Sequence, residues 1–270
     1  MGLMIQPLSQ ETCRYDEATD GGFRSGRSVP RLRVRGGADA GAAAEWWSGS
    51  MAFDRMVKFG RDRVRIAAVG TLALLGSTVP SWAHHPLGGD VPSTAFHGFL
   101  SGIGHPVIGL DHLAFILAMG VAAWVIGRPI LLPLLFIVAT VFGTLLHVSS
   151  IGLPLVEAVV SATVLLAGAL LVSGRSMNLS ITATLFLVAG LFHGHAYGEA
   201  VFGAEATPLF AYLFGFGMIQ FAIATAAGFL TVGTARGHRD ELNARLAGAA
   251  VAGVGAVFVS NLALASLGLG

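Results

Sequence analysis

The chain has 270 residues, of which 54% are hydrophobic and only 11% are charged. Soluble domains usually carry about 25% charged residues, so this composition argues against a soluble domain and indicates a membrane protein. Eleven of the sixteen Lys and Arg residues precede position 84, and no basic stripe that could bind a phosphate backbone remains beyond it. Nucleic acid is therefore not an expected partner.

Cys13 is the only cysteine, and it lies near the start of the chain. The apolar part of the chain can therefore form no disulfide and offers no thiolate to a metal ion. A metal site there would use imidazole, carboxylate, thioether or backbone oxygen ligands. Such ligands suit borderline divalent ions.

Residues 1–50 are polar, Gly-rich and Arg-rich and show no sustained hydrophobic period. We expect them to be disordered and interpret them as an over-extended translation start. Residues 51–83, starting at Met51 or Met56, have the layout of a secretory signal peptide, with basic residues, an apolar stretch and a cleavage point after Ala83. Residues 84–270 are the expected mature domain, which begins with His84 and His85 on the outer side of the membrane.

A short apolar piece over 95–103 carries His97 and is followed by Gly104. Because it is too short to cross a bilayer, we expect a short interfacial or re-entrant helix. Six runs of roughly the length that a spanning helix requires then follow, which predicts an all-α membrane protein with six transmembrane helices. The expected spans are 107–127, 130–148, 152–173, 179–198, 208–233 and 243–267.

The loops between these spans place every basic residue beyond position 84 on one side of the membrane. These residues are Arg128, Arg175, Arg236, Arg239 and Arg245. Cytoplasmic loops are enriched in Lys and Arg, so this side is the expected inside. The prediction is a multi-pass protein of the bacterial inner membrane whose mature N-terminus and C-terminus are periplasmic, in agreement with the signal peptide.

The ionisable residues in or beside the first four spans fall at the outer ends of these spans. Ionisable side chains at membrane depth are costly and mark functional sites, and a cation entry site would gather them on one side. The candidate metal ligands are His105, Asp111, His112, His147, Glu157, His193, His195 and Glu199. Candidates for metal capture at the outer surface are His84, His85 and His97.

The residues from His105 to His112, which we call the opening motif of the first span, suggest a helix start. We expect Pro106 at the first helical position, where its missing N–H costs nothing, with His105 just before it. His105 and His112, which are seven residues apart, would share a face if that helix is continuous.

In the fourth span, His195 and Glu199 share one helix face, as do His193 and Tyr197. His193 and His195 diverge by about 200° on an ideal helix, so both cannot face one pore unless Gly194 distorts it.

Simpler interpretations stand beside these. The opening motif could be an interfacial cap with a helix-end ion pair, and Glu157 could be a protonated carboxyl bonded to a neighbouring helix. His147 could bond a loop carbonyl. In the fourth span the histidines could serve helix packing, and Glu199 could lie in an aqueous loop.

Two motifs carry a resemblance to a known family. They are His-Pro-x-x-Gly-x-Asp-His from His105 to His112 and His-Gly-His-Ala-Tyr-Gly-Glu from His193 to Glu199. With His97-Gly98-Phe99, Glu157 after Pro154 and the signal peptide, they resemble the HupE/UreJ family of bacterial nickel and cobalt permeases, accessory to hydrogenase or urease. The resemblance covers residues 84–270 and includes the number of spans.

The resemblance implies that His105, Asp111 and His112 are essential for transport. By the same resemblance, further candidates for a role in transport are His147, Glu157 and His193. Two features depart from the family: a bare His84-His85 pair stands where a longer His-rich stretch is usual, and residues 1–50 have no counterpart.

Together these features predict an inner-membrane permease domain over 84–270 that imports Ni²⁺, or Co²⁺, for hydrogenase, urease or cobalamin maturation. The metal ion is the substrate and no permanently bound cofactor is expected. Expected partners are the divalent ion and the lipid bilayer, with a second copy of the chain or a cytoplasmic metallochaperone as further candidates. The alternatives are a membrane-embedded metalloenzyme and a non-transporting metal-binding subunit. The sequence holds no His-x-x-x-His pair, so an enzyme is not expected.

Overall fold

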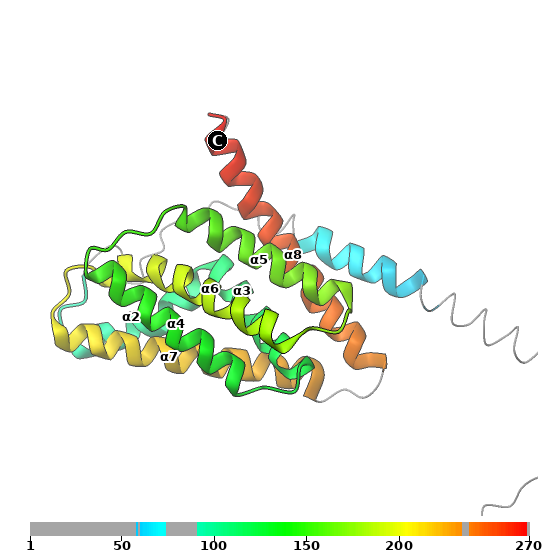
Figure 1. Ribbon diagram of the computed structural model, residues 1–270, viewed down its shortest axis with the longest axis horizontal. Helices are drawn as coiled ribbons and strands as arrows, with labels where there is room; N and C mark the ends of the chain where they lie inside the picture. The colour runs from blue at the N-terminus through cyan, green and yellow to red at the C-terminus, as the bar shows by residue number, and fades with distance from the viewer. Residues whose placement is uncertain (1–57, 59, 74–90, 234–237, 269–270) are drawn as a thin grey trace, which may run out of the picture. The chain divides into compact units, whose positions relative to one another are not determined.

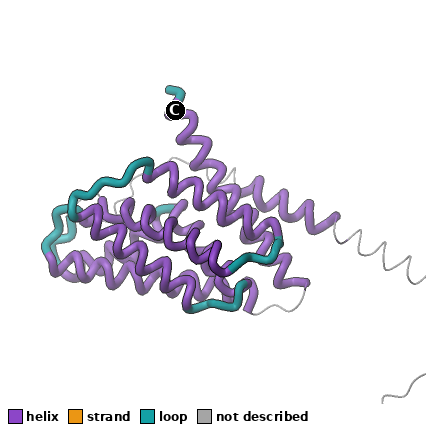
Figure 2. The backbone as a smooth tube through the Cα atoms, in the orientation of Figure 1, coloured by secondary structure: helices purple, strands orange, loops and turns teal. Residues whose placement is uncertain are grey.

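The computed structural model describes residues 58, 60–73, 91–233 and 238–268, and the regular structure in these residues is helical (Figures 1 and 2). The prediction of an all-α fold is confirmed. His84, His85, the expected cleavage point after Ala83 and residues 1–50 lie outside the described residues. The signal peptide and the domain boundaries therefore stay predictions.

Residues 60–73 are helical, and the labelled elements follow them along the chain. They are α2 (Ala95–Ile108), α3 (Leu110–Val125), α4 (Leu131–Val148), α5 (Val156–Ser173), α6 (Leu179–Tyr197), the 3₁₀ helix η1 (Gly198–Val201), α7 (Ala206–Gly228), the π-helical turn η2 (Phe229–Gly233) and α8 (His238–Ser266). Among the described residues, five helices are long and apolar enough to cross a membrane, and the bent pair α2–α3 makes a sixth. The expected six spans are reached when this pair is counted as one.

The first span differs from the prediction. Helix α2 runs on through Gly104 and Pro106 to Ile108, so neither the expected end at Gly104 nor the expected start at Pro106 is correct. The break falls instead at Gly109, whose extended backbone (φ −71°, ψ 104°) cannot continue a helix, and α2 and α3 meet there at 81°. A proline inside a helix is tolerated when neighbouring helices supply the packing, as α7 does here.

Helices α2 and α3 together form one broken span rather than a re-entrant loop. Gly98 of α2 packs against the backbone of Pro208 near the start of α7, and Gly120 of α3 packs against Ala224 near its end. Both helices therefore pass along α7 in the same direction. The motif around Gly109 lies at the break within this span. Its His112 contacts His193 and Tyr197 near the end of α6, and the outer position expected from the sequence stays a prediction.

Small residues also allow the other main helix pairs to approach closely. The most extensive contacts, besides α2 with α7, join α4 with α6 and α5 with α8. In the first pair Gly194 lies against the backbone of Thr140, and in the second Gly168 lies against Ala252. Contact between backbones is the usual basis of helix association in lipid, where burial of apolar surface provides no driving force.

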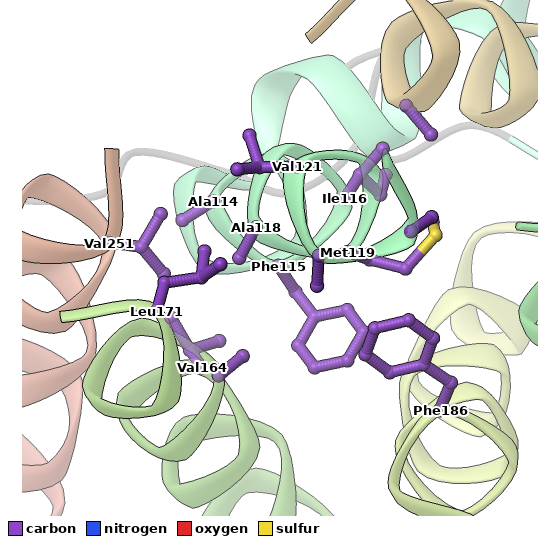
Figure 3. Close-up of a cluster of buried hydrophobic side chains, with 14 of the residues drawn as sticks. Ala114, Phe115, Ile116, Ala118, Met119, Val121, Val164, Leu171, Phe186 and Val251 are labelled. Carbon is purple, nitrogen blue, oxygen red and sulfur yellow. The ribbon is translucent and has the colours of Figure 1, made fainter. Parts of the chain in front are cut away.

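A buried apolar core fills the middle of the bundle (Figure 3). The ring of Phe115 contacts those of Phe136 and Phe186, with centroids 5.1 Å apart for Phe115 and Phe136 and 5.9 Å apart for Phe115 and Phe186. Figure 3 shows Phe115 and Phe186 beside Met119 of α3, with Val164 of α5 completing this layer. The same layer also borders the site described below.

We expect Gly120→Ala to destabilise the bundle by about 1–3 kcal/mol, the usual cost of overpacking a tight interior. The added methyl group would clash with the carbonyl oxygen of Ala224, a backbone atom that can move only if α3 and α7 separate. Thermal unfolding in detergent micelles measures the change. Gly152→Ala is the control because no atom lies within 4 Å of the added Cβ at that position. Equal unfolding temperatures for both variants would contradict the close-packing argument.

Candidate metal-binding pocket

A cavity of about 670 Å³ lies where α4 and α6 end and α5 begins, and we call it the pocket. Its lining includes seven of the eight candidate ligands, from helices α2 to α6 and η1: His105, Asp111, His112, His147, Glu157, His195 and Glu199. The eighth, His193, is completely buried behind His112. His97 is exposed on α2 and does not line the pocket.

The candidate ligands do not converge on one point. Among the described residues, no three His, Cys, Asp or Glu side chains are arranged to hold a single ion. The ring contacts instead divide the histidines into two sets. The base group, at the break between α2 and α3, is His105, Asp111 and His112. The rim group, at the ends of α4 and α6, is His147, His195 and Glu199.

A chain of hydrogen bonds fixes the proton on His112. The hydroxyl of Thr163 donates to the carbonyl of Val160 at 2.8 Å, so it can only accept from Nε2 of His193, which lies 3.1 Å away. Nδ1 of a neutral His193 is then an acceptor, and it lies 2.8 Å from Nδ1 of His112. His112 therefore carries its proton on Nδ1, and its unprotonated nitrogen is Nε2.

A second series of hydrogen bonds fixes the proton on His105 in the same way. The hydroxyl of Tyr212 donates to the carbonyl of Tyr197 at 3.1 Å, so it accepts from Nδ1 of His105 across a longer distance of 3.4 Å. Nε2 is again the unprotonated nitrogen. Both histidines of the base group thus hold the same tautomer, and in each case the chain ends at a backbone carbonyl.

Asp111 occupies the first turn of α3, where its Oδ1 accepts the backbone N–H of His112 at 2.9 Å. A carboxylate at this position stabilises the positive end of the helix dipole. Gly109 leaves room for the neighbouring ring, because a Cβ there would lie 2.7 Å from Cδ2 of His112. The glycine that breaks the span therefore also allows His112 to lie against the backbone.

Tyr197 forms the aromatic wall between the two base histidines. Its ring centroid lies 4.2 Å from that of His112 and 5.1 Å from that of His105. The Tyr197 hydroxyl is buried and has no hydrogen-bond partner in the part of the chain that the structure describes. The sequence placed Tyr197 and His193 on one face of α6, and both do contact the ring of His112.

Four polar residues of the site were absent from the sequence-based set. They are Ser161 and Asn261 in the pocket lining, and Thr163 and Tyr212 behind the histidines. Ser161 follows Glu157 by four residues, so a search for polar residues on the same helix face would have found it. Thr163 and Tyr212 gave only the weaker signal of a polar group within an apolar span.

The fold and the pocket define a multi-helix membrane protein whose interior holds histidines and carboxylates. The model of the HupE / UreJ protein family matches residues 72–258. Protein HupE of Rhizobium leguminosarum bv. viciae is 31% identical over 192 residues, which cover 70% of this chain and 96% of that protein. No solved structure matches the chain.

The chain therefore belongs to the HupE/UreJ family, a hydrogenase and urease accessory family of nickel and cobalt transport. The resemblance seen in the two motifs is confirmed. The family is one of transport and accessory proteins rather than of catalytic enzymes.

We expect Thr163→Val to abolish the fixed tautomer of His112, whereas Thr163→Ser should retain it. Valine removes the acceptor that Thr163 offers to Nε2 of His193, so the protons on both imidazoles are no longer ordered. Nitrogen-15 spectra of histidine-labelled protein, with the His112 signal identified from His112→Gln, measure which ring nitrogen is protonated. An unchanged His112 signal in the valine variant would show that Thr163 does not direct the proton.

Proposed function

We propose that the chain is a permease that imports Ni²⁺, with Co²⁺ as alternative cargo, through the pocket. The observation that carries the proposal is that seven histidines and carboxylates line one cavity within a helix bundle of this family. Imidazole and carboxylate ligands favour borderline divalent ions over Mg²⁺ and Ca²⁺, which prefer oxygen-only sites.

In this proposal the base group contacts the ion as it passes, since no three of the described side chains are arranged to hold one ion at rest. His105 and His112 contribute Nε2, and Asp111 contributes a carboxylate oxygen while its Oδ1 holds the start of α3. His193 acts differently from the other histidines because both of its ring nitrogens are hydrogen bonded, to His112 and Thr163. We therefore assign it the role of orienting His112, since partners of this kind fix the ring and the tautomer of a metal-binding histidine.

The charge distribution supports import from the pocket side. Arg128 and Arg175 lie in the loops after α3 and α5, at the end of the bundle opposite the pocket, and this is the end expected to face the cytoplasm. A divalent ion that crosses an inside-negative potential gains about 4.6 kcal/mol per 100 mV, so uptake needs no nucleotide. The bacterial inner membrane and periplasmic termini are part of the same proposal.

The imported ion would serve the maturation of hydrogenase, urease or cobalamin enzymes, through a cytoplasmic metallochaperone or directly. Initial capture by His84, His85 or His97 remains a prediction. The competing function is a metal-binding subunit that does not transport, which would use the same ligands but move no ion across the membrane. A membrane-embedded metalloenzyme is the weaker alternative because the family is not catalytic.

We expect cells that lack their own nickel importers to accumulate radioactive nickel when they express this chain. Asp111→Asn and His112→Gln should reduce uptake to that of empty cells. The asparagine keeps an oxygen that can accept the N–H of His112, so its failure would reflect loss of charge rather than loss of the helix cap.

Glu205→Gln is the matched control because Glu205 is an exposed carboxylate at the start of α7, on the same end of the bundle and outside the pocket. It should transport as the unmodified chain does at equal membrane abundance. Uptake by the unmodified chain no better than that of empty cells would reject the permease, and full uptake by both pocket variants would reject the assigned ligands.

A further inference from the structure

Gln220 of α7 is a buried amide with one of its two polar groups unpaired. The side chain is completely buried, and Nε2 donates to the carbonyl of Phe216 in the same helix at 3.2 Å. Oε1 is buried as well and has no hydrogen-bond partner among the described residues. A buried acceptor without a partner costs free energy, and an apolar side chain of similar shape would avoid that cost. Stability of the fold therefore does not explain this amide.

Bonding between helices does not explain Gln220 either. An amide side chain in a membrane span usually stabilises the bundle by a hydrogen bond from one helix to the next. The bond that Gln220 donates stays within α7, and its oxygen bonds to no other helix in the part of the chain that the structure describes. A role in the passage of the substrate is the remaining reason to keep a polar group here.

Gln220 lies on a buried strip of α7 that starts at the base group. Every fourth residue of this helix from Tyr212 to Gly228 is buried. The hydroxyl of Tyr212 lies 3.4 Å from Nδ1 of His105, and the ring of Phe216 contacts that of Tyr197, with centroids 4.5 Å apart. Four residues rise about 6 Å along a helix, so Gln220 lies about 6 Å beyond Phe216, away from the pocket. It is the first polar side chain of the strip beyond the base group.

Beyond Gln220 the strip follows α3 toward the other end of the bundle. The backbone of Ala224 lies against Gly120, and Gly228 lies against the ring of Trp124. Trp124 stands near the end of α3, which closes at Val125. The strip therefore runs from the base group to the far end of this helix, with Gln220 between the two.

A second cavity, of about 320 Å³, opens at the far end of the strip. Trp124 lines it together with Asp240 and Glu241 at the start of α8, and the wall also contains Arg175 and Arg245. Oδ1 of Asp240 is buried and has no hydrogen-bond partner within the described residues. The two cavities of the bundle thus lie at opposite ends of one strip of α7.

We propose that Gln220 contacts the ion on its way from the base group to the second cavity. This inference rests on the proposed transport function. Oε1 supplies an oxygen ligand within the apolar interior, and water molecules that the ion retains complete its coordination. Conduction requires binding that is strong enough for the ion to enter and weak enough for it to leave. A neutral amide oxygen meets this condition better than a carboxylate, which would hold a divalent ion longer.

The test is the rate of radioactive nickel uptake at a series of nickel concentrations, in cells without their own importers, for Gln220→Leu. Leucine removes the amide oxygen from a side chain of similar volume. The maximal rate should fall about tenfold, the size expected when one polar contact to a charge is lost. The concentration for half-maximal uptake should not change, because the ion binds first at the base group. Met218→Leu is the control, an exposed residue of the same helix that should leave both values unchanged.

Thermal unfolding in detergent micelles separates this role from a structural one. Leucine removes an unpartnered polar atom, so Gln220→Leu should unfold at the same temperature as the unmodified chain or at a higher one. A lower unfolding temperature would overturn the proposal by showing that the amide supports the fold. If Gln220→Leu does not reach the membrane, Gln220→Met replaces it, and failure of both variants to fold would overturn the proposal for the same reason.

The outcome for the permease is read from the unmodified chain. No nickel uptake by that chain would reject the proposed transport function. Uptake by the unmodified chain with the same maximal rate in Gln220→Leu would reject the role of Gln220 and leave the permease standing.

Discussion

The break at Gly109 is the constraint on which the rest of the structure depends. In lipid every backbone polar group needs a partner within the protein, so an interrupted helix is tolerated only where protein or a water-filled cavity surrounds it. Here the N–H of Gly109 is bonded to His105, that of Leu113 to the carbonyl of Gly109, and that of His112 to the side chain of Asp111. Three of the residues that close the break, His105, Asp111 and His112, therefore also line the pocket.

The pairing of helices by small residues explains how these side chains stay in register. Gly194 brings α6 against α4, and Gly143 of α4 lies in turn against the backbone of Leu191 and His195. Backbones in contact cannot slide without a clash, so His195 has one position relative to α4. The spacing of His147 and His195 thus follows from helix packing and not only from the side chains themselves.

The length of apolar runs was sufficient to predict most helices, as in the fourth span, expected over 179–198 and observed as Leu179–Tyr197. The prediction was wrong at Pro106. The residue preferences of helix ends favoured a helix start there, whereas α2 packs on α7 and continues through Pro106 to Ile108. The residue types of the pocket were also readable, because charge within an apolar run is rare. The division of these residues into a base group and a rim group was not readable from the sequence. It depends on how far each helix is shifted along its axis relative to its neighbours, which the sequence of one chain does not record directly.

The layer of Phe115, Phe136 and Phe186 has a consequence for the speed of conduction. His193 lies against two of these rings, with centroids 4.7 Å from Phe115 and 6.0 Å from Phe136. A hydrated ion at the base group would meet closely packed hydrocarbon on its way to the far side, and a charge without ligands does not enter such a medium. Passage then requires the bundle to rearrange once for each ion. If the chain transports as proposed, we therefore expect it to work at the pace of a saturable carrier and not of an open channel.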